Sequence, residues 1–578
     1  MNLLLFLLML TALLSCGSGE LSRVCPQVVI HGDKKLKLSE TEKRMVCGDP
    51  EVEAYREIPT YQAQFFFKGF LQSKGYLEPE FVTEKDVLHV HVGKKAKLKR
   101  VAVYSDSEKE STFVEDNIRR LYKGKLLTPK LLNDVEAQAQ SFVRQRGYPC
   151  AKVKSVVNTQ DSSAAITLER LHHFNFGDFE KEKLRGLEDD ALARYYPFRA
   201  NDPFNEKLLT LTEKRMMRAE VVQGTYFLEK CDDDGKTFSF SQNFLQGPAK
   251  SIRFGAGANT EVGPMVRVKW SNNRFRPMAS QLSANLQASL RNQTLNLTAD
   301  YFLWKRHPRR SLFSQLELVR DSQIDFEQVV LRAKPHMKWT NDHWGHLFTY
   351  TFGPTYETGH FTSTEDADTR GFSTGAIEGA FQMLSHTYEL FDIHPQEGDS
   401  LQFNFDYRHP SLGFSDQLLK LDSSWVKLSR IGEWGRGTLV GGLRLNAATT
   451  VVDDDVPLER LPPTVKFFGG GSDDLRGFVL KTLPKNDGLG ALTKLGAKLE
   501  LRRTYLYKES VEAFTFLDTA YFGFRSWDVE RTLWYTPGLG VRWLSPIGLV
   551  QTYYARAYTQ RPRKDYGNFF FVGLGGAF

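Results

Sequence analysis

The chain has 578 residues, too many for one hydrophobic core, and this length corresponds to about three to five structural units. The net charge of +7 is small for this length and the basic residues do not gather on one helix, so no nucleic-acid partner is expected. After the N-terminal segment no run of eighteen apolar residues occurs, so no transmembrane helix is expected there.

Residues 1–18 are expected to be a signal peptide. The chain begins with the apolar run MNLLLFLLMLTALLS, which has the length of an export signal. Cys16 follows a Leu-Leu-Ser stretch that is close to a bacterial lipoprotein cleavage box, so Cys16 is a candidate lipidation site. Plain cleavage after residues 16–18 is the alternative, and in both cases the mature chain leaves the cytoplasm.

The remaining cysteines all lie in the first half of the chain. Cys25 and Cys47 are a candidate local disulfide in an oxidising compartment. Cys150 and Cys231 are expected to be small core residues on strands, because free cysteine is often buried. Their spacing fits no zinc pattern, so no metal site is expected. The last 347 residues (578 − 231) contain no cysteine, which indicates a second architecture.

From about residue 25 to 246 a pattern recurs three times. A helix ends, Gly-Tyr or Gly-x-Tyr follows at residues 75–76, 147–148 and 224–226, and two short strands come next. The spacings of 72 (147 − 75) and 77 (224 − 147) residues indicate a repeat. The predicted units are 25–95, 96–171 and 172–246, with the order β-α-α-β-β.

The second unit shows this order most clearly. Strands are predicted at 98–104, 150–157 and 164–171, with a helix at 113–122 and another that begins at Thr128 and Pro129. The third unit has a predicted strand at 174–179, a helix at about 206–222 and strands at 224–231 and 237–244. In the first unit strands are predicted at 80–84 and 87–92, and the fold of 28–57 stays open.

From residue 250 onward the pattern alternates with a period of two. Residues 280–290 read SQLSANLQASL, and 294–303, 401–408 and 494–502 alternate in the same way. A soluble β-sandwich also alternates. Strands of about ten residues with aromatic side chains at their ends favour a transmembrane barrel. At about twenty residues for each strand and loop, the 328 residues (578 − 250) predict about sixteen strands.

Residues 467–478 read FFGGGSDDLRGF. Three consecutive glycines allow backbone conformations with positive φ, so the segment can fold into a narrow space. Arg476 carries a permanent charge with a planar fork of donors. Inside a barrel lumen this charge requires a carboxylate partner.

The repeated unit, with glycine before its last hairpin, resembles the POTRA (polypeptide-transport-associated) domain. With the signal, the barrel and the late loop, the chain resembles the BamA/TamA superfamily of outer-membrane assembly factors, the TamA type most closely. The sharpest motif is Leu475-Arg476-Gly477-Phe478, in which Leu475 replaces the family's β-branched residue. Further motifs lie at 514–518, 538–548 and 252–264, and the final aromatic strand ends at Phe578.

The resemblance implies a fold of α+β tandem POTRA-like domains followed by an antiparallel transmembrane β-barrel of about 16 strands, placed at 250–578. It implies that Arg476 points into the lumen and pairs with Asp518 on the wall. It also implies a weak seam between the first and last strands. The expected seam residues are Ile252, Phe254, Gly573, Gly575 and Phe578.

By the same resemblance the chain inserts or translocates β-barrel or autotransporter-type clients at the bacterial outer membrane, with its POTRA-like units in the periplasm. The implied partners are unfolded client proteins, a TamB-like periplasm-spanning protein and outer-membrane lipid, without a cofactor. The G-x-S-x-G stretch at 371–375 opens an alternating strand, so no enzyme is predicted. The alternatives are a passive pore or two-partner-type secretion transporter, and a surface adhesin that uses loop 359–370.

Overall fold

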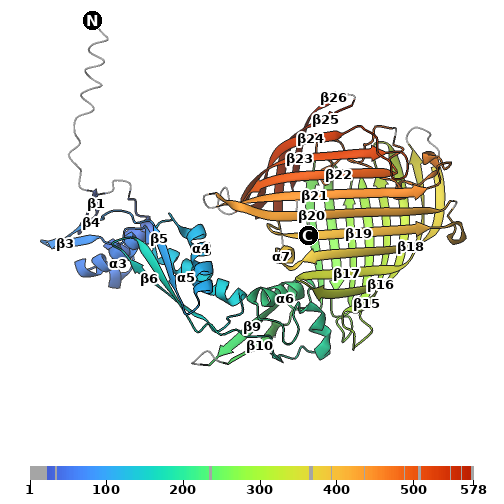
Figure 1. Cartoon of the computed structure of the whole chain (residues 1–578). Helices are drawn as coiled ribbons and strands as arrows, with labels where there is room; N and C mark the ends of the chain where they lie inside the picture. The colour runs from blue at the N-terminus through green and yellow to red at the C-terminus, as the bar shows by residue number, and fades with distance from the viewer. Residues whose placement is uncertain are drawn as a thin grey trace, which may run out of the picture. The chain divides into compact units, whose positions relative to one another are not determined.

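The computed structural model describes residues 22–32, 36–232, 237–363, 369–391, 394–414, 416–434, 437–486, 488–504, 510–546, 548–561 and 563–574 (Figure 1). Cys16, Gly575 and Phe578 lie outside the described residues. The chain forms two compact units. One comprises the residues through Phe176 with Pro203–Glu206 and Lys230–Ser239, and the other comprises the rest. Within the described ranges, no helix is long and apolar enough to cross a membrane.

The first sheet has four strands in the order β1-β2-β4-β3. Ser39 begins the helix α2 with a capping box, in which its hydroxyl accepts from the Glu42 N–H and the Glu42 carboxylate accepts from the Ser39 N–H. Cys25 and Cys47 form a disulfide with Cα atoms 5.7 Å apart, as the sequence suggested. The elements are β1 (Ser22–Cys25), β2 (Val28–His31), α2 (Glu40–Cys47), η1 (Glu53–Tyr55), α3 (Thr60–Ser73), β3 (Glu80–Glu84) and β4 (Val87–His91).

The second sheet has the order β5-β7-β6 and follows the predicted β-α-α-β-β pattern. The Thr128 hydroxyl accepts from the Leu131 N–H at 3.1 Å and Pro129 opens the helix α5, as expected for a helix start. One face of α5, including Val135, Ala139 and Val143, is completely buried against the sheet. The elements are β5 (Arg100–Tyr104), α4 (Glu108–Tyr122), α5 (Pro129–Gln145), β6 (Lys152–Asn158) and β7 (Ser163–Glu169).

The third sheet has the order β8-β10-β9. The predicted strand at 174–179 is wrong. Phe176 packs on Phe204 at 5.2 Å and Phe179 on Phe240 at 4.6 Å, so these aromatic rings fill the core and only two later residues pair as a strand. The elements are β8 (Glu180–Lys181), η2 (Asp189–Tyr195), α6 (Glu206–Arg218), β9 (Gly224–Cys231) and β10 (Phe238–Leu245).

The prediction that Cys150 and Cys231 are separate core thiols is also wrong. They form a disulfide with Cα atoms 5.7 Å apart. The two cysteines are 81 residues apart in sequence, and the spacing alone gave no sign that the end of β9 lies beside the residues before β6. The bond closes a long loop, and such bonds stabilise chiefly by restricting the unfolded chain.

The second half is a closed barrel of sixteen antiparallel strands, each beside its neighbour in sequence, which confirms the predicted fold class (Figure 1). The strands are β11 (Lys250–Asn259), β12 (Gly263–Asn272), β13 (Gln281–Ser289), β14 (Asn292–Tyr301), β15 (Arg310–Ser322), β16 (Phe326–His343), β17 (His346–Ser363), β18 (Thr369–Ser385), β19 (Gly398–Arg408), β20 (Leu418–Trp434), β21 (Gly437–Val452), β22 (Thr493–Arg503), β23 (Val511–Gly523), β24 (Trp534–Ser545), β25 (Gly548–Thr559) and β26 (Lys564–Leu574). Short helices α7 (His386–Glu389), η3 (Pro410–Leu412), η4 (Leu458–Arg460) and η5 (Pro463–Val465) lie in the connections.

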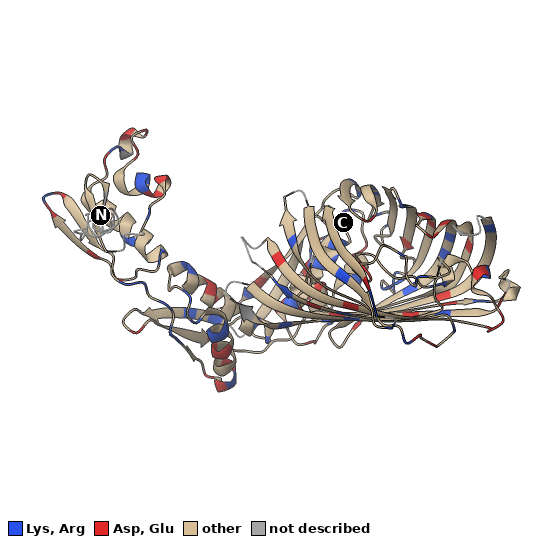
Figure 2. Cartoon of the chain, turned by 90° about the horizontal axis from the view of Figure 1, so that it is seen from above, with Lys and Arg blue, Asp and Glu red and all other residues tan. Residues whose placement is uncertain are grey.

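The alternation of the sequence separates an apolar outer face from a polar lumen. On β13 and β14, Leu286 lies opposite Leu295 and both side chains are exposed on the outside. One residue earlier along β13, the register pairs Asn285 with Asn296 on the lumen side. Charged residues recur along the barrel strands, separated by uncharged stretches (Figure 2). This arrangement fits a barrel whose outer surface faces lipid.

Several strands are longer than the ten residues that the sequence suggested. β16 and β17 have 18 residues each, whereas β11 to β14 have nine or ten. About ten tilted residues are enough to cross the hydrocarbon core, so the long strands continue beyond it.

The helix α6 is fastened to the barrel by a buried arginine. Arg215 donates to Asp342 at 2.8 and 3.0 Å and to Glu389 at 3.1 Å. All three side chains are only 6% exposed. Asp342 ends β16 and Glu389 lies in α7, so one guanidinium joins two connections at the same end of the barrel. Charge-assisted hydrogen bonds between buried groups hold such a contact firmly.

Candidate functional site in the barrel lumen

The connection 453–492 between β21 and β22 folds back on itself inside the barrel. Phe467 pairs with Ala491, and Gly469 pairs with Leu483. Gly470 has a φ of 103°, and a Cβ at this position would lie 2.1 Å from the Val479 carbonyl oxygen. Only glycine fits such a close approach of two backbones. The consecutive glycines therefore allow the tight fold that carries Arg476.

Arg476 is held by two carboxylates from the barrel wall. Its Nε and Nη2 donate to the two carboxylate oxygens of Asp518 on β23, both at 2.7 Å. Its Nη1 donates to Glu500 on β22 at 2.8 Å. Arg476 is 5% exposed and Asp518 is completely buried. The guanidinium also lies over the Phe516 ring at 3.6 Å, so its charge is satisfied on every side.

A second arginine extends this cluster. Arg542 on β24 donates to Glu500 and to Glu512, both at 2.9 Å. Glu500 is thus shared by Arg476 and Arg542. We call Arg476, Asp518, Glu500 and Arg542 the arginine anchor. The sequence predicted Arg476 and Asp518, but not Glu500 and Arg542, whose only signal was their lumen-facing place in alternating strands.

The rest of the sequence motif packs in an apolar pocket on the same wall. Leu475 and Phe478 are 1% and 4% exposed. The Phe478 ring meets Trp534 at 5.4 Å and Tyr566 at 5.5 Å. Gly477 has a φ of 107°, and a Cβ there would lie 2.9 Å from Thr536. All four motif residues, 475–478, therefore pack closely against the barrel wall.

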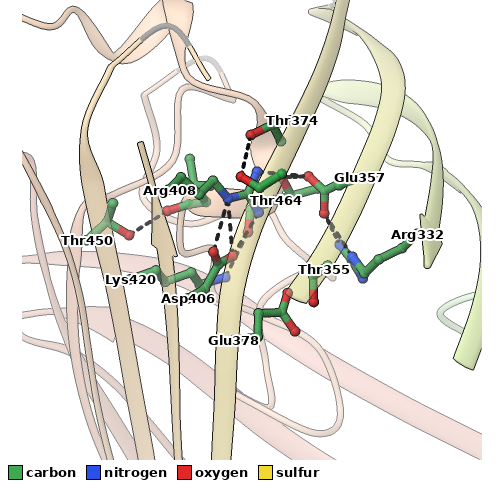
Figure 3. A network of polar contacts seen from close by, with 12 residues as sticks. Arg332, Thr355, Glu357, Thr374, Glu378, Asp406, Arg408, Lys420, Thr450 and Thr464 are labelled. Carbon is green, nitrogen blue, oxygen red and sulfur yellow. Dashed lines mark hydrogen bonds and ion pairs between the residues drawn. The ribbon is translucent and has the colours of Figure 1, made fainter. Parts of the chain in front are cut away.

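Another part of the wall, formed by β17, β19 and β20, holds an earlier part of the same connection. Arg408 donates to Glu357 at 3.1 Å and to Asp406 at 2.8 Å, and it lies between these two acids (Figure 3). Glu357 also accepts from the Thr464 hydroxyl at 2.8 Å. Lys420 donates to the Thr464 carbonyl at 2.7 Å. We call Arg408, Glu357, Asp406, Lys420 and Thr464 the second anchor, which was not predicted from the sequence.

Over the described residues, the seam between the first and last strands is short. β11 forms ten residue pairs with β12, and β26 forms ten with β25. In the described residues, β11 and β26 share two pairs, Ala258 with Leu574 and Asn259 with Gly573. One further backbone bond runs from the Thr260 N–H to the Val572 carbonyl at 3.0 Å. Residues 564–571 of β26 therefore have no partner on β11.

The other predicted seam residues lie on the outside of β11. Ile252 and Phe254 are 60% and 74% exposed. They have no pairing partner among the described residues of β26. The sequence therefore located the two strands that meet, while the pairs that join them are at the far end of β11.

Glu261 links residues 467–478, which we call the motif loop, to this seam. It lies in the turn between β11 and β12 and is 9% exposed. One carboxylate oxygen accepts from the Ser472 N–H at 2.7 Å and the other from the Ser472 hydroxyl at 2.8 Å. The next residue toward the seam is Thr260, which bonds to β26. The loop tip and the closing strand pair thus share one turn.

The described residues arrange neither the G-x-S-x-G serine for nucleophilic attack nor a side-chain cluster for metal binding. The G-x-S-x-G stretch lies within β18, where no strand-to-helix turn presents the serine. Among the described residues, no group of three or more His, Cys, Asp or Glu side chains is arranged to hold a metal ion.

Comparison with known proteins gives a family match over the C-terminal third. Residues 387–578 match the Omp85 superfamily domain. BamA from Haemophilus ducreyi lacking POTRA domains 1–3 is similar, at 15% identity over 83% of this chain and 100% of that chain, with a TM-score of 0.48. CdiB from Escherichia coli is similar at 11% identity over 94% of this chain and 100% of that chain, with a TM-score of 0.46. POTRA3–5 of Haemophilus influenzae BamA is similar at 14% identity over 38% of this chain and 94% of that chain, with a TM-score of 0.26.

The matched segment runs from α7 into the last strand and includes the motif loop, Asp518 and the β26 side of the seam. The features assembled in the lumen thus lie largely within the family domain. Residues 387–578, which form the second part of the closed β-barrel, are therefore similar to the Omp85 superfamily domain.

Proposed function

We propose that this protein inserts or translocates β-barrel or autotransporter-type clients at the outer membrane, by opening the seam between β11 and β26. Its POTRA-like units, at 25–95, 96–171 and 172–246, receive these clients or a TamB-like periplasmic partner. The observation that carries the proposal is the seam as the described residues show it: within them, two residue pairs join strands that each form ten pairs on their other side.

A short seam leaves backbone groups free to pair with another chain. In an antiparallel strand every second residue directs its N–H and C=O to a given side. Residues 564–571 of β26 therefore offer donors and acceptors that β11 does not use. Such an edge binds an extended peptide of almost any sequence through its backbone. This suits a protein that handles many different β-strand clients.

The motif loop is attached to the barrel wall by more side-chain contacts than the seam has. The arginine anchor holds the loop to β22, β23 and β24, and Glu261 fastens the loop tip to the first hairpin. We propose that the loop keeps the barrel folded while the seam opens, and that the bond from Ser472 to Glu261 sets how readily β11 moves.

Two edge strands of the N-terminal sheets support a role in receiving clients. The orders β1-β2-β4-β3 and β5-β7-β6 leave β3 and β6 as edges. Val82 on β3 is 45% exposed and Val156 on β6 is 67% exposed. An edge strand with exposed β-branched residues suits β-strand addition by an unfolded segment.

A disulfide across the seam tests the proposal. A Cβ built at Gly573 lies 3.5 Å from the Asn259 Cβ, which is within disulfide range, although the Phe571 ring must shift. The variant Asn259→Cys/Gly573→Cys is expected to lose client insertion into liposomes when oxidised and to recover it when reduced. Full activity of the oxidised variant would overturn the lateral seam.

The control places the same bond within the wall. Ser283 and Thr298 face each other across β13 and β14, with hydroxyl oxygens 2.6 Å apart. Oxidised Ser283→Cys/Thr298→Cys is expected to keep full activity, because these strands already pair along their length.

The same assay separates the proposed function from its alternatives. Client passage through a sealed barrel would favour a two-partner-type transporter, and ion conductance without insertion would favour a passive pore. An adhesin would require loop 359–370, of which residues 364–368 lie outside the described residues.

A further inference from the structure

A cavity of about 340 Å³ lies in the lumen beside the tip of the motif loop. Its walls come from β20, β21, β22 and β24, from Ser472 and Asp473 of the loop, and from the segment that follows α7. This volume is at the lower end of the range for small-molecule sites. Five cationic side chains line it, Arg444, Arg476, Lys498, Arg502 and Arg542, but only two carboxylates, Asp473 and Glu500.

The strand register explains why these cations surround a hollow. On β21 and β22, Arg444 lies opposite Lys498, Gly442 opposite Glu500, and Val440 opposite Arg502. Gly442 contributes no side chain to the lumen wall. A Cβ at Gly442 would lie 3.1 Å from Leu428 Cδ2, so a leucine rather than a further charge borders this position between the longer cationic residues.

The wall carboxylate nearest these cations is already in use. Glu500 accepts from Arg476 Nη1 at 2.8 Å and from Arg542 Nη1 at 2.9 Å. Two guanidinium groups therefore compete for one acid. Neither Arg444 nor Arg502 gains a hydrogen bond from it.

Two arginines form no ion pair within 4 Å among the described residues, although Glu512 and Glu500 lie near enough to Arg502 to attract its charge. Arg502 is 7% exposed, and its buried Nη2 has no acceptor in the part of the chain that the structure describes. Arg444 faces the lumen, and across the same described ranges it forms no ion pair or side-chain hydrogen bond. His394 Nε2, on the same cavity, is also buried without a partner there. Buried donors without acceptors are costly, so these side chains favour a ligand that supplies acceptors.

We propose that this cavity binds an oxyanion of the phosphate type, either a soluble phosphate or the phosphate of a lipid headgroup. The planar fork of arginine matches phosphate oxygens in two-point contacts. Arg444 and Arg502 lie on different strands on either side of Gly442, so they reach a central group from two directions. A phosphate presents oxygens in several directions at once, whereas a carboxylate presents two in one plane.

Binding of radiolabelled pyrophosphate to the purified full-length protein in detergent tests the site. One ion is expected to bind to each chain of the natural protein. Arg444→Gln/Arg502→Gln is expected to bind at least tenfold more weakly. The control Arg267→Gln/Lys269→Gln removes the same charge from the lumen side of β12 and is expected to bind within about twofold of the natural protein. Equal binding by all three proteins would overturn the site.

The single variant Arg444→Gln tests the site in a protein that is expected to fold normally. Arg502 is buried, so its replacement can disturb the wall, whereas Arg444 is exposed to the lumen and loses no partner. Arg444→Gln with normal heat-modifiable gel mobility is expected to weaken pyrophosphate binding by about three- to tenfold. Unchanged binding by this folded variant would also overturn the site.

Lipid extraction identifies the source of the phosphate. A phospholipid that co-purifies with the natural protein and the control, but not with Arg444→Gln/Arg502→Gln, would identify a headgroup. Pyrophosphate binding without such a lipid would identify a soluble phosphate.

Discussion

The motif loop and the seam are held to the same barrel in different ways. In the arginine anchor, one buried guanidinium makes three side-chain hydrogen bonds of 2.7 to 2.8 Å to two carboxylates. At the seam, the described part of the chain has two residue pairs between β11 and β26, and the pairing residues are small or polar apart from Leu574. Contacts that resist separation are concentrated in the loop, and contacts that separate easily are at the seam.

This difference assigns stability and motion to separate parts of the barrel. An opening event needs a region whose contacts contribute little free energy, because such regions open without global unfolding. A buried ion pair cannot fill that role, since losing one partner leaves an unpaired charge. Changes in the anchors are therefore expected to act on folding, and changes at the seam on activity.

Arg476→Ala is expected to have the largest effect. It leaves the Asp518 carboxylate completely buried without its cation, and of the hydrogen bonds from residue 476 only the backbone N–H bond at 3.2 Å is kept. Removing one partner of such a pair costs about 3–5 kcal/mol. Urea unfolding of the barrel in detergent and heat-modifiable gel mobility measure the loss.

The double variant sharpens this prediction. Arg476→Ala/Asp518→Ala removes both charges, so its destabilisation is expected to be well below the sum of the two single variants. Additive losses would contradict a direct pairing.

Arg408→Met in the second anchor is expected to have a smaller effect. Asp406 still lies opposite Lys420, and Glu357 still accepts from Arg332 at 2.8 Å, so neither acid is left without a cation. We expect a loss of about 2–3 kcal/mol, measured by the same urea unfolding. A loss as large as that of Arg476→Ala would show that the two anchors contribute equally.

The sequence predicted the barrel because alternation is a local property of each strand. The alternation along β13 alone assigns Leu286 to the outer face and Asn285 to the lumen face, and it requires no information about the neighbouring strand. Arg476 and Asp518 were predicted because each lies in a recognisable motif. The lumen side of β22 was visible too, but many lumen-facing charges were equally good partners for the loop. Only the register and the path of the loop bring Glu500 to Arg476.

The second anchor and the disulfide were missed for the same reason. Thr464 meets Glu357 across 107 residues, and Cys150 meets Cys231 across 81. No local pattern marks such distant pairs. Likewise, the sequence identified β11 and β26 as neighbours, but the register that pairs Ala258 with Leu574 and Asn259 with Gly573 depends on the stagger of the whole barrel.

Ser472→Ala tests the connection between the two regions. The variant loses the hydroxyl bond to Glu261 but keeps the backbone N–H bond at 2.7 Å. We expect a loss of about 1 kcal/mol in unfolding, and faster oxidation of Asn259→Cys/Gly573→Cys as β11 moves more freely. An unchanged oxidation rate would mean that the loop tip does not control the seam.

Thr260→Val at the seam is expected to have the smallest effect on stability. The Thr260 hydroxyl accepts from the Val572 N–H at 3.4 Å, a long bond, whereas the Thr260 N–H bond to the Val572 carbonyl at 3.0 Å is kept. We expect a change of about 0.5 kcal/mol or less in urea unfolding, because the lost bond is weak and exposed. Client insertion is nevertheless expected to change measurably, because few other contacts hold the seam. A large loss of stability without a change in insertion would contradict the division of roles between anchor and seam.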